Sequence, residues 1–68
     1  MYLTQEEFNV LNCKINGLRN IEISKKYNIS ETKVSIIYHN LLEKYGVIDL
    51  LQLLKKVDLN EIKIIESH

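Results

Sequence analysis

The sequence of 68 residues contains no proline, two glycines and a single cysteine. Because no proline is present to break a helix from within, we expect helices to end at Gly17, Asn28 and Gly46, residues that tolerate the left-handed conformation. One cysteine cannot form an internal disulfide or a zinc site built from several cysteines. We therefore interpret Cys13 as a small core residue in a reducing compartment.

An excess of charge of one sign and long apolar runs are also missing. Nine basic residues balance nine acidic ones, so the net charge gives no support to a nucleic-acid partner, and only a local patch would do so. No stretch approaches the roughly 18 apolar residues of a membrane span. The N-terminus lacks the basic and apolar regions of a signal peptide. We expect a cytoplasmic protein with no membrane association.

What the sequence does contain is helical periodicity, in a chain whose 46% hydrophobic residues suffice for one domain with a small core. We predict an all-α fold with four helices, at about residues 4–16, 20–27, 31–45 and 49–57. Thr4 and Glu7 have the spacing of a capping box at the first of these. The inward stripes of the third and fourth helices are Val34, Ile37, Leu41 and Tyr45, and Leu50, Leu53, Leu54 and Val57.

Residues 58–68 extend beyond the four helices. Asp58 and Glu61 have the spacing of a second capping box, and Leu59, Ile62 and Ile65 follow at helical spacing. We expect a short additional C-terminal helix in this extension, with strand potential only in "IKII".

The second and third helices, joined by residues 28–30, have the form of a helix-turn-helix. In that motif the later helix presents its solvent face to the base edges of DNA. Hydroxyl and imidazole groups can donate hydrogen bonds to phosphates or bases, and an isoleucine can contact a thymine methyl. The alternative is a merely solvated face in a small α-domain. At about 100° per residue, this face carries Thr32, Ser35, Ile36, His39 and Glu43.

The same segments resemble a known family. "LTQEE" and "VL" near the start, "GLRNIEIS" leading into the second helix, "ISETKV" opening the third and "NLLEKYGV" closing it occur in order and without a gap. They make residues 3–57 similar to the LuxR-type (GerE-like) helix-turn-helix domain. The resemblance implies a four-helix domain over residues 1–57, in which the third helix reads double-stranded DNA and the fourth pairs two protomers.

Carried over position by position, the resemblance implies three sets of contacts. The base-contacting positions are Ser35, Ile36 and His39. The positions that contact the DNA backbone are Asn20, Ser30, Thr32, Lys33 and Lys44. The dimer interface on the fourth helix includes Ile48, Leu51 and Lys55.

The sequence departs from the family pattern where positive charge is usual. The family's Thr-Val-Lys-x-His places Ser35 where the lysine is expected, and Ile21 and Glu43 also stand at positions that are usually basic. Each lost phosphate contact lowers the affinity for DNA and its dependence on salt. Residues 19–45 still carry five basic residues against three acidic ones.

Two functions of different classes follow. The first is a stand-alone, sequence-specific transcription regulator that binds DNA as a homodimer. The second is a protein-interaction module on the same fold, which binds and inhibits another transcription regulator or contacts RNA polymerase. We do not expect an enzyme, because the chain shows no nucleophile with a base, no metal-binding set and no phosphate-binding glycine loop. We also expect no cofactor and no metal.

Overall fold

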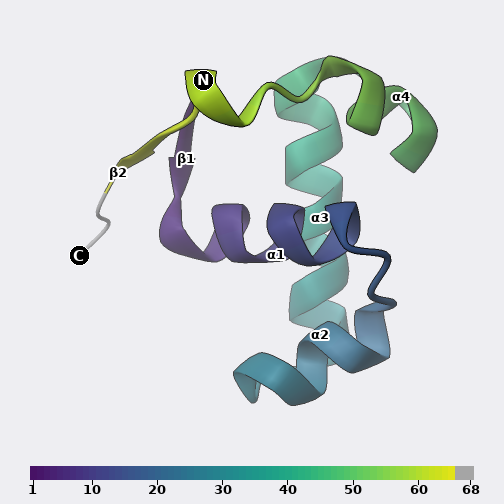
Figure 1. Ribbon diagram of the computed structural model, residues 1–68. Helices are drawn as coiled ribbons and strands as arrows, with labels where there is room; N and C mark the ends of the chain where they lie inside the picture. Colours follow the sequence, from purple (N-terminus) through teal and green to yellow (C-terminus); the bar gives the residue numbers. More distant parts are fainter. Residues whose placement is uncertain (66–68) are drawn as a thin grey trace.

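Four helices make up most of the protein, whose computed structural model describes residues 1–65. They are α1 (Gln5–Ile15), α2 (Asn20–Tyr27), α3 (Glu31–Tyr45) and α4 (Leu50–Lys56). Two short strands, β1 (Tyr2–Thr4) and β2 (Lys63–Ile65), pair in parallel, and a 3-10 turn at Leu59–Glu61 precedes β2. In Figure 1 the long helix α3 spans the height of the molecule, α1 crosses in front of it, and α2 and α4 lie at its two ends.

Local signals in the sequence define where the helices begin and end. The Thr4 hydroxyl accepts a hydrogen bond from the Glu7 amide at 3.2 Å, and the Glu7 carboxylate accepts one from the Thr4 amide at 2.9 Å. This reciprocal pair is the predicted capping box. Ser30 Oγ accepts from the Lys33 amide at 3.0 Å and so caps α3. That helix ends at Gly46, whose φ of 65° is the left-handed conformation that glycine adopts without strain.

The core lies where α1, α2 and α4 meet the inner side of α3. Because α1 crosses α3 near the middle of α3, the buried side of α3 packs against both α1 and α2. Side chains from every helix and from β1 are almost fully withdrawn from solvent, as expected for apolar stripes at helical spacing. They are Leu3, Val10, Leu11, Cys13, Ile23, Val34, Ile37, Leu41, Leu42, Val47 and Leu53.

The segment after α4 differs from the prediction. Asp58 Oδ1 accepts a hydrogen bond from the Asn60 amide at 3.0 Å, as a cap would, but only one 3-10 turn follows. The short C-terminal helix that we predict is wrong over the described part of this segment, because residues 63–65 form a strand instead. Residues 66–68, the rest of the predicted extension, lie outside the described residues.

Tertiary contacts explain why this segment becomes a strand. The Lys63 amide donates to the Met1 carbonyl at 2.9 Å, and the ammonium of Met1 donates to the Glu61 carbonyl at 3.0 Å. Ile64 lies opposite Leu3 in the parallel ladder, and β-branched side chains suit a strand. A helix in residues 62–65 would give up these bonds to the N-terminal strand. The two ends of the described chain therefore lie side by side (Figure 1).

One side chain of the predicted core points elsewhere. Helical spacing places Leu54 on the inward stripe of α4, but 40% of its surface is exposed. On this short helix only Leu53 is fully buried, while Leu50 and Val57 are partly buried against the core. None of the helices in residues 1–65 is long and apolar enough to cross a membrane.

Candidate nucleic-acid interface

The turn between α2 and α3 sets the direction in which α3 leaves the domain. Asn28 closes α2 in the left-handed conformation, with φ of 55° and ψ of 47°. The Ile29 amide then donates to the Ser24 carbonyl at 3.1 Å, and the Ser24 hydroxyl donates to the Ile29 carbonyl at 2.7 Å. With Ser30 capping α3, every residue of this turn has a defined role. The chain thus forms the helix-turn-helix that its sequence predicts.

The outward face of α3 carries the side chains that we predict to contact bases. Ile36 has 56% of its surface exposed, and His39 is also exposed. Ser35 is half-buried at the edge of the same face. The imidazole of His39 lies 6.2 Å from the Tyr38 ring, measured between ring centroids, and at a tilt of 43°. The face therefore offers one apolar contact between two polar ones.

Polar side chains that we predict to contact the DNA backbone lie at the N-terminal ends of α2 and α3. Ser30 and Thr32 are exposed, and a hydroxyl that accepts as a cap keeps its own hydrogen for donation. The N-terminus of α3 adds backbone amides and the positive end of the helix dipole, which both favour phosphate. Asn20 is half-buried as the first residue of α2. Its amide oxygen is buried without a hydrogen-bond partner in the described structure.

The two lysines that we predict to contact the DNA backbone are each paired with an acid within the domain. Lys33 Nζ lies 3.0 Å from Glu6 Oε2. Lys44 Nζ lies 2.8 Å from Glu7 Oε1 and also donates to the Tyr2 carbonyl at 3.3 Å. Both acids belong to the first turn of α1, which therefore pairs with both lysines of α3.

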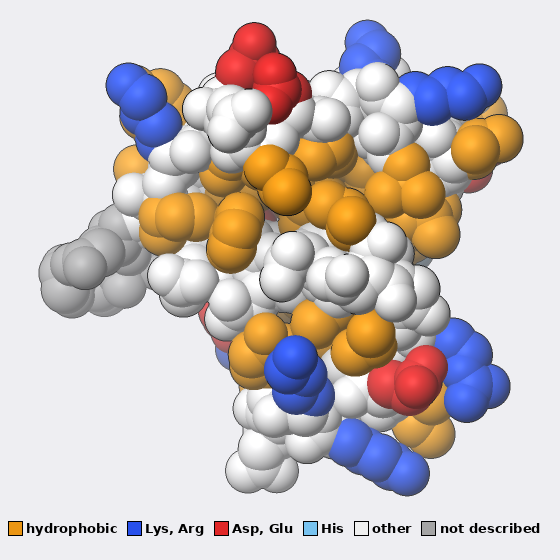
Figure 2. All heavy atoms as spheres, viewed as in Figure 1, with side chains coloured by type: hydrophobic (Ala, Val, Ile, Leu, Met, Phe, Trp, Pro, Cys, Tyr) orange, Lys and Arg blue, Asp and Glu red, His pale blue; other side chains and the backbone are white. Residues whose placement is uncertain are grey.

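A third pair involves Arg19, which precedes α2. Its Nε lies 3.3 Å from Glu22 Oε1, and its amide donates to the same oxygen at 2.9 Å. These backbone and side-chain hydrogen bonds hold the pKa of Glu22 below its ordinary value. In the view of Figure 2, basic side chains lie scattered over the visible face and form no single basic patch.

Glu7 shows how firmly one of these pairs is built. Burial alone would raise the pKa of its carboxyl group, but the hydrogen bonds from Lys44 and from the Thr4 amide outweigh burial. The pKa of Glu7 is therefore lowered from its ordinary value of 4.5. Only 8% of the residue is exposed, and a buried carboxylate that is hydrogen-bonded in its charged form stays ionised at neutral pH.

The family model described as "Bacterial regulatory proteins, luxR family" matches residues 1–57. The chain belongs to this family. The predicted all-α, four-helix LuxR-type domain is thereby confirmed, and with it a helix-turn-helix DNA-binding domain of transcription regulation rather than an enzyme family. Comparisons with curated proteins and with solved structures gave no match. Strand β2 lies beyond the matched residues, so this LuxR-family domain carries an added strand that pairs with its first one.

The predicted dimer positions of this LuxR-family domain are exposed. Ile48 has 81% of its surface exposed and Leu51 has 64%, and Lys55 is also exposed. Leu54, exposed on the same helix, follows Leu51 at a spacing of three residues, which places both on one side of α4. These two residues, together with Ile48 in the turn just before α4, are called the α4 stripe below.

Sequence reasoning did not find the acidic partners of the lysines. Glu6 is 27 residues from Lys33, and Glu7 is 37 residues from Lys44. Neither pair has the spacing of three or four residues that marks a pair on one helix. The only signal available was the prediction that Glu7 belongs to a capping box. That prediction places the Glu7 carboxylate beside Thr4, but it does not identify Lys44 as the second partner.

Proposed function

We propose that this LuxR-family domain binds double-stranded DNA sequence-specifically as a homodimer, with α3 in the major groove. The observation that carries the proposal is the outward face of α3, where Ser35, Ile36 and His39 lie on a capped helix that packs against α1. This face combines an exposed apolar side chain with exposed and half-buried polar ones, in the helix-turn-helix position that family membership associates with DNA. Family membership supports DNA binding, and this face is the basis for proposing that α3 contacts the bases.

The three side chains suit different parts of a base pair. His39 can donate to guanine O6 or N7 or to a thymine O4, and the Ser35 hydroxyl can donate or accept. Ile36 can pack against the C5-methyl of thymine. Backbone contacts come from Ser30, Thr32 and the N-terminus of α3, which position the helix without reading the sequence. A mixed site that contains at least one thymine opposite Ile36 is the expected target.

We expect two protomers to be needed, because one protomer alone should bind the DNA backbone weakly. The ammonium of Lys44 is held by Glu7, so each protomer presents few free charges to phosphate. Pairing two protomers makes the second binding event intramolecular, which raises overall affinity without a new contact. The α4 stripe supports pairing, because a group of exposed apolar residues is a usual protein interface.

Fluorescence anisotropy with duplexes selected from a random library tests the proposal. We expect the logarithm of the binding constant to fall linearly with the logarithm of salt concentration. His39→Ala should weaken binding to the selected site about five- to tenfold, the loss expected for one hydrogen bond at an interface. Asn12→Ala, an exposed polar-to-alanine change on α1, is the matched control and should leave binding unchanged. If no duplex is retained even at low salt, the proposal fails.

The ion pairs of these basic residues favour a second candidate function, which is binding to another protein. With Lys33, Lys44 and Arg19 each beside a glutamate, the same fold is suited to contact a protein, such as another transcription regulator or RNA polymerase. Ile36 and the α4 stripe would then contribute the apolar contacts. A stable complex with a longer LuxR-type regulator in size-exclusion chromatography, together with no binding to any duplex, would support this candidate over the first.

A further inference from the structure

The two acidic residues that open α1 hold the two lysines of α3 in different ways. Lys33 and Lys44 are 11 residues apart, which at about 100° per residue is close to three full turns. Both side chains therefore leave α3 on the side that α1 crosses. Glu6 reaches Lys33 and Glu7 reaches Lys44. The difference between the pairs lies in their burial and in the number of bonds that each acid makes.

The Glu7–Lys44 pair is part of the folded framework. The Glu7 side chain is 11% exposed, and its Oε1 accepts from both the Thr4 amide and Lys44 Nζ. Lys44 also donates to the Tyr2 carbonyl. Removing this lysine would leave a buried carboxylate short of a partner, which is costly in a protein interior. We therefore do not expect Lys44 to exchange Glu7 for a DNA phosphate.

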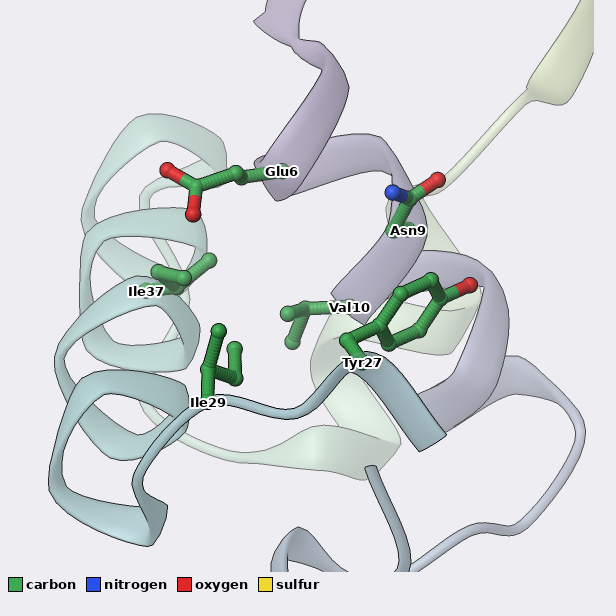
Figure 3. Close-up of a pocket in the computed structure, with 6 residues that line it drawn as sticks. All are labelled: Glu6, Asn9, Val10, Tyr27, Ile29 and Ile37. Carbon is green, nitrogen blue, oxygen red and sulfur yellow. The ribbon is translucent and has the colours of Figure 1, made fainter. Parts of the chain in front are cut away.

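The Glu6–Lys33 pair is exposed and simple. The side chains of Lys33 and Glu6 are 52% and 56% exposed, and a single contact of 3.0 Å joins them. Figure 3 shows Glu6 reaching from α1 toward α3, with its carboxylate beside Ile37 at the edge of a cavity of about 210 Å³. Three of the lining side chains, Val10, Ile29 and Ile37, are apolar and cannot give the carboxylate a hydrogen bond.

We propose that Glu6 competes with DNA phosphate for Lys33 and thereby limits the affinity of the domain for DNA. The inference rests on the proposed function, because it needs the start of α3 to approach the DNA backbone. Lys33 follows the Ser30 cap, in the first turn of α3, where amides and the helix dipole already favour phosphate. For Lys33 to contact that phosphate, the Lys33 ammonium must leave the Glu6 carboxylate, or the carboxylate and the phosphate must lie beside the same ammonium and repel each other.

The size of the effect follows from the exposure of the pair. Ion pairs between exposed side chains are weak, and their loss changes an equilibrium roughly two- to fivefold. A phosphate is a good replacement partner, since binding it also releases condensed counterions. Removing the charge of Glu6 should therefore raise DNA affinity roughly two- to fivefold at low salt, with a smaller gain at high salt where charges are screened.

A double-mutant cycle with Glu6→Gln and Lys33→Gln tests the proposal by anisotropy on one selected duplex. Glu61→Gln is the control, because it changes net charge equally but lies in the 3-10 turn before β2. Glu6→Gln should raise affinity two- to fivefold more than Glu61→Gln. In the Lys33→Gln background that extra gain should vanish. Thermal unfolding of each variant shows whether all remain folded.

Two results overturn the proposal while leaving the proposed function intact. One is that Glu6→Gln and Glu61→Gln raise DNA affinity equally, which is an effect of net charge alone. The other is that the gain of Glu6→Gln survives in the Lys33→Gln background, so that it does not act through Lys33. A complete lack of DNA binding by the wild-type protein and every variant would instead overturn the proposed function, and this inference with it.

Discussion

At the scale of single residues, Glu7 links the start of α1 to the end of α3. Its carboxylate accepts from the Thr4 amide and from Lys44, and the residue is almost fully buried. Glu7→Gln keeps the shape and one acceptor oxygen but removes the charge. We expect this variant to lose about 1–2 kcal/mol of the free energy of unfolding at neutral pH, because hydrogen bonds to charged groups exceed neutral ones. Urea denaturation measures the change.

The pH dependence of that loss is a separate prediction. Because the pKa of Glu7 is lowered in the folded protein, its contribution is fully present above the unfolded value near 4.5. The contribution is then lost as the pH falls from there through the folded pKa. The gap between wild type and Glu7→Gln should therefore narrow as the pH is lowered from 5 toward about 3. A gap that is constant over this range would mean that the charge of Glu7 contributes nothing.

Residue-scale features divide into those visible in the sequence and those that are not. Thr4 and Glu7 stand three residues apart, so their capping box could be predicted from spacing, and the structure contains both of its hydrogen bonds. The contact between Glu7 and Lys44 depends on how α1 crosses α3, which no local spacing encodes. The same holds for Glu6 and Lys33. The sequence therefore shows how many charged residues the motif has, but it does not show which of them are paired within the domain.

At the scale of elements, the helices follow local signals and the last strand does not. Ser30 and Gly46 mark the two ends of α3 in the sequence, because a cap and a left-handed glycine act within a few residues. Residues 62–65 contain both a helical spacing and β-branched side chains, so the local signals conflict. The Met1 carbonyl, just before β1 and far away in the sequence, favours the strand by accepting a hydrogen bond from the Lys63 amide. Whether residues 62–65 form a helix or a strand can therefore be decided only when the fold is known.

The strand β2 is tested through its hydrogen bond to β1. Lys63→Pro removes the amide that donates to the Met1 carbonyl at 2.9 Å. We expect the free energy of unfolding to fall by about 1 kcal/mol, the usual worth of one hydrogen bond. The helical circular dichroism should stay unchanged, because β2 lies outside the four helices.

Lys63→Ala is the matched control for this element. It removes the same exposed side chain but keeps the amide, so its effect on stability should stay within about 0.5 kcal/mol. Equal stabilities for the proline and alanine variants would show that the pairing of β1 and β2 does not stabilise the domain in solution.

At the scale of the whole molecule, apolar surface is left over after folding. Figure 2 shows hydrophobic side chains gathered in a band across the upper part of the face that carries the sheet, α1 and α4. A chain this small cannot bury all its apolar residues in one core. Pairing of two protomers would withdraw more of this surface from water and would double the number of recognition helices. Stability and DNA binding should therefore depend together on protein concentration.

The α4 stripe is tested by placing a charge within it. Leu51→Glu puts a carboxylate at the middle of the proposed interface, where each protomer would bring the same charge against its partner. We expect sedimentation velocity to show a monomer where the wild type is a dimer. The affinity for a two-fold-related duplex should fall by at least tenfold, because the second half-site no longer binds intramolecularly. Affinity for a single half-site should not change, because α3 is untouched.

Gln52→Glu controls for charge on the same helix. Gln52 is the next residue, is exposed, and uses its side-chain oxygen to accept from the Ile48 amide at 3.2 Å, a bond that a carboxylate preserves. This variant adds the same charge outside the α4 stripe, so it should dimerise like the wild type and bind the two-fold-related duplex with little change. If Leu51→Glu and Gln52→Glu behave alike, the two protomers do not meet through the α4 stripe. A wild type that remains monomeric both alone and on DNA would exclude the homodimer altogether.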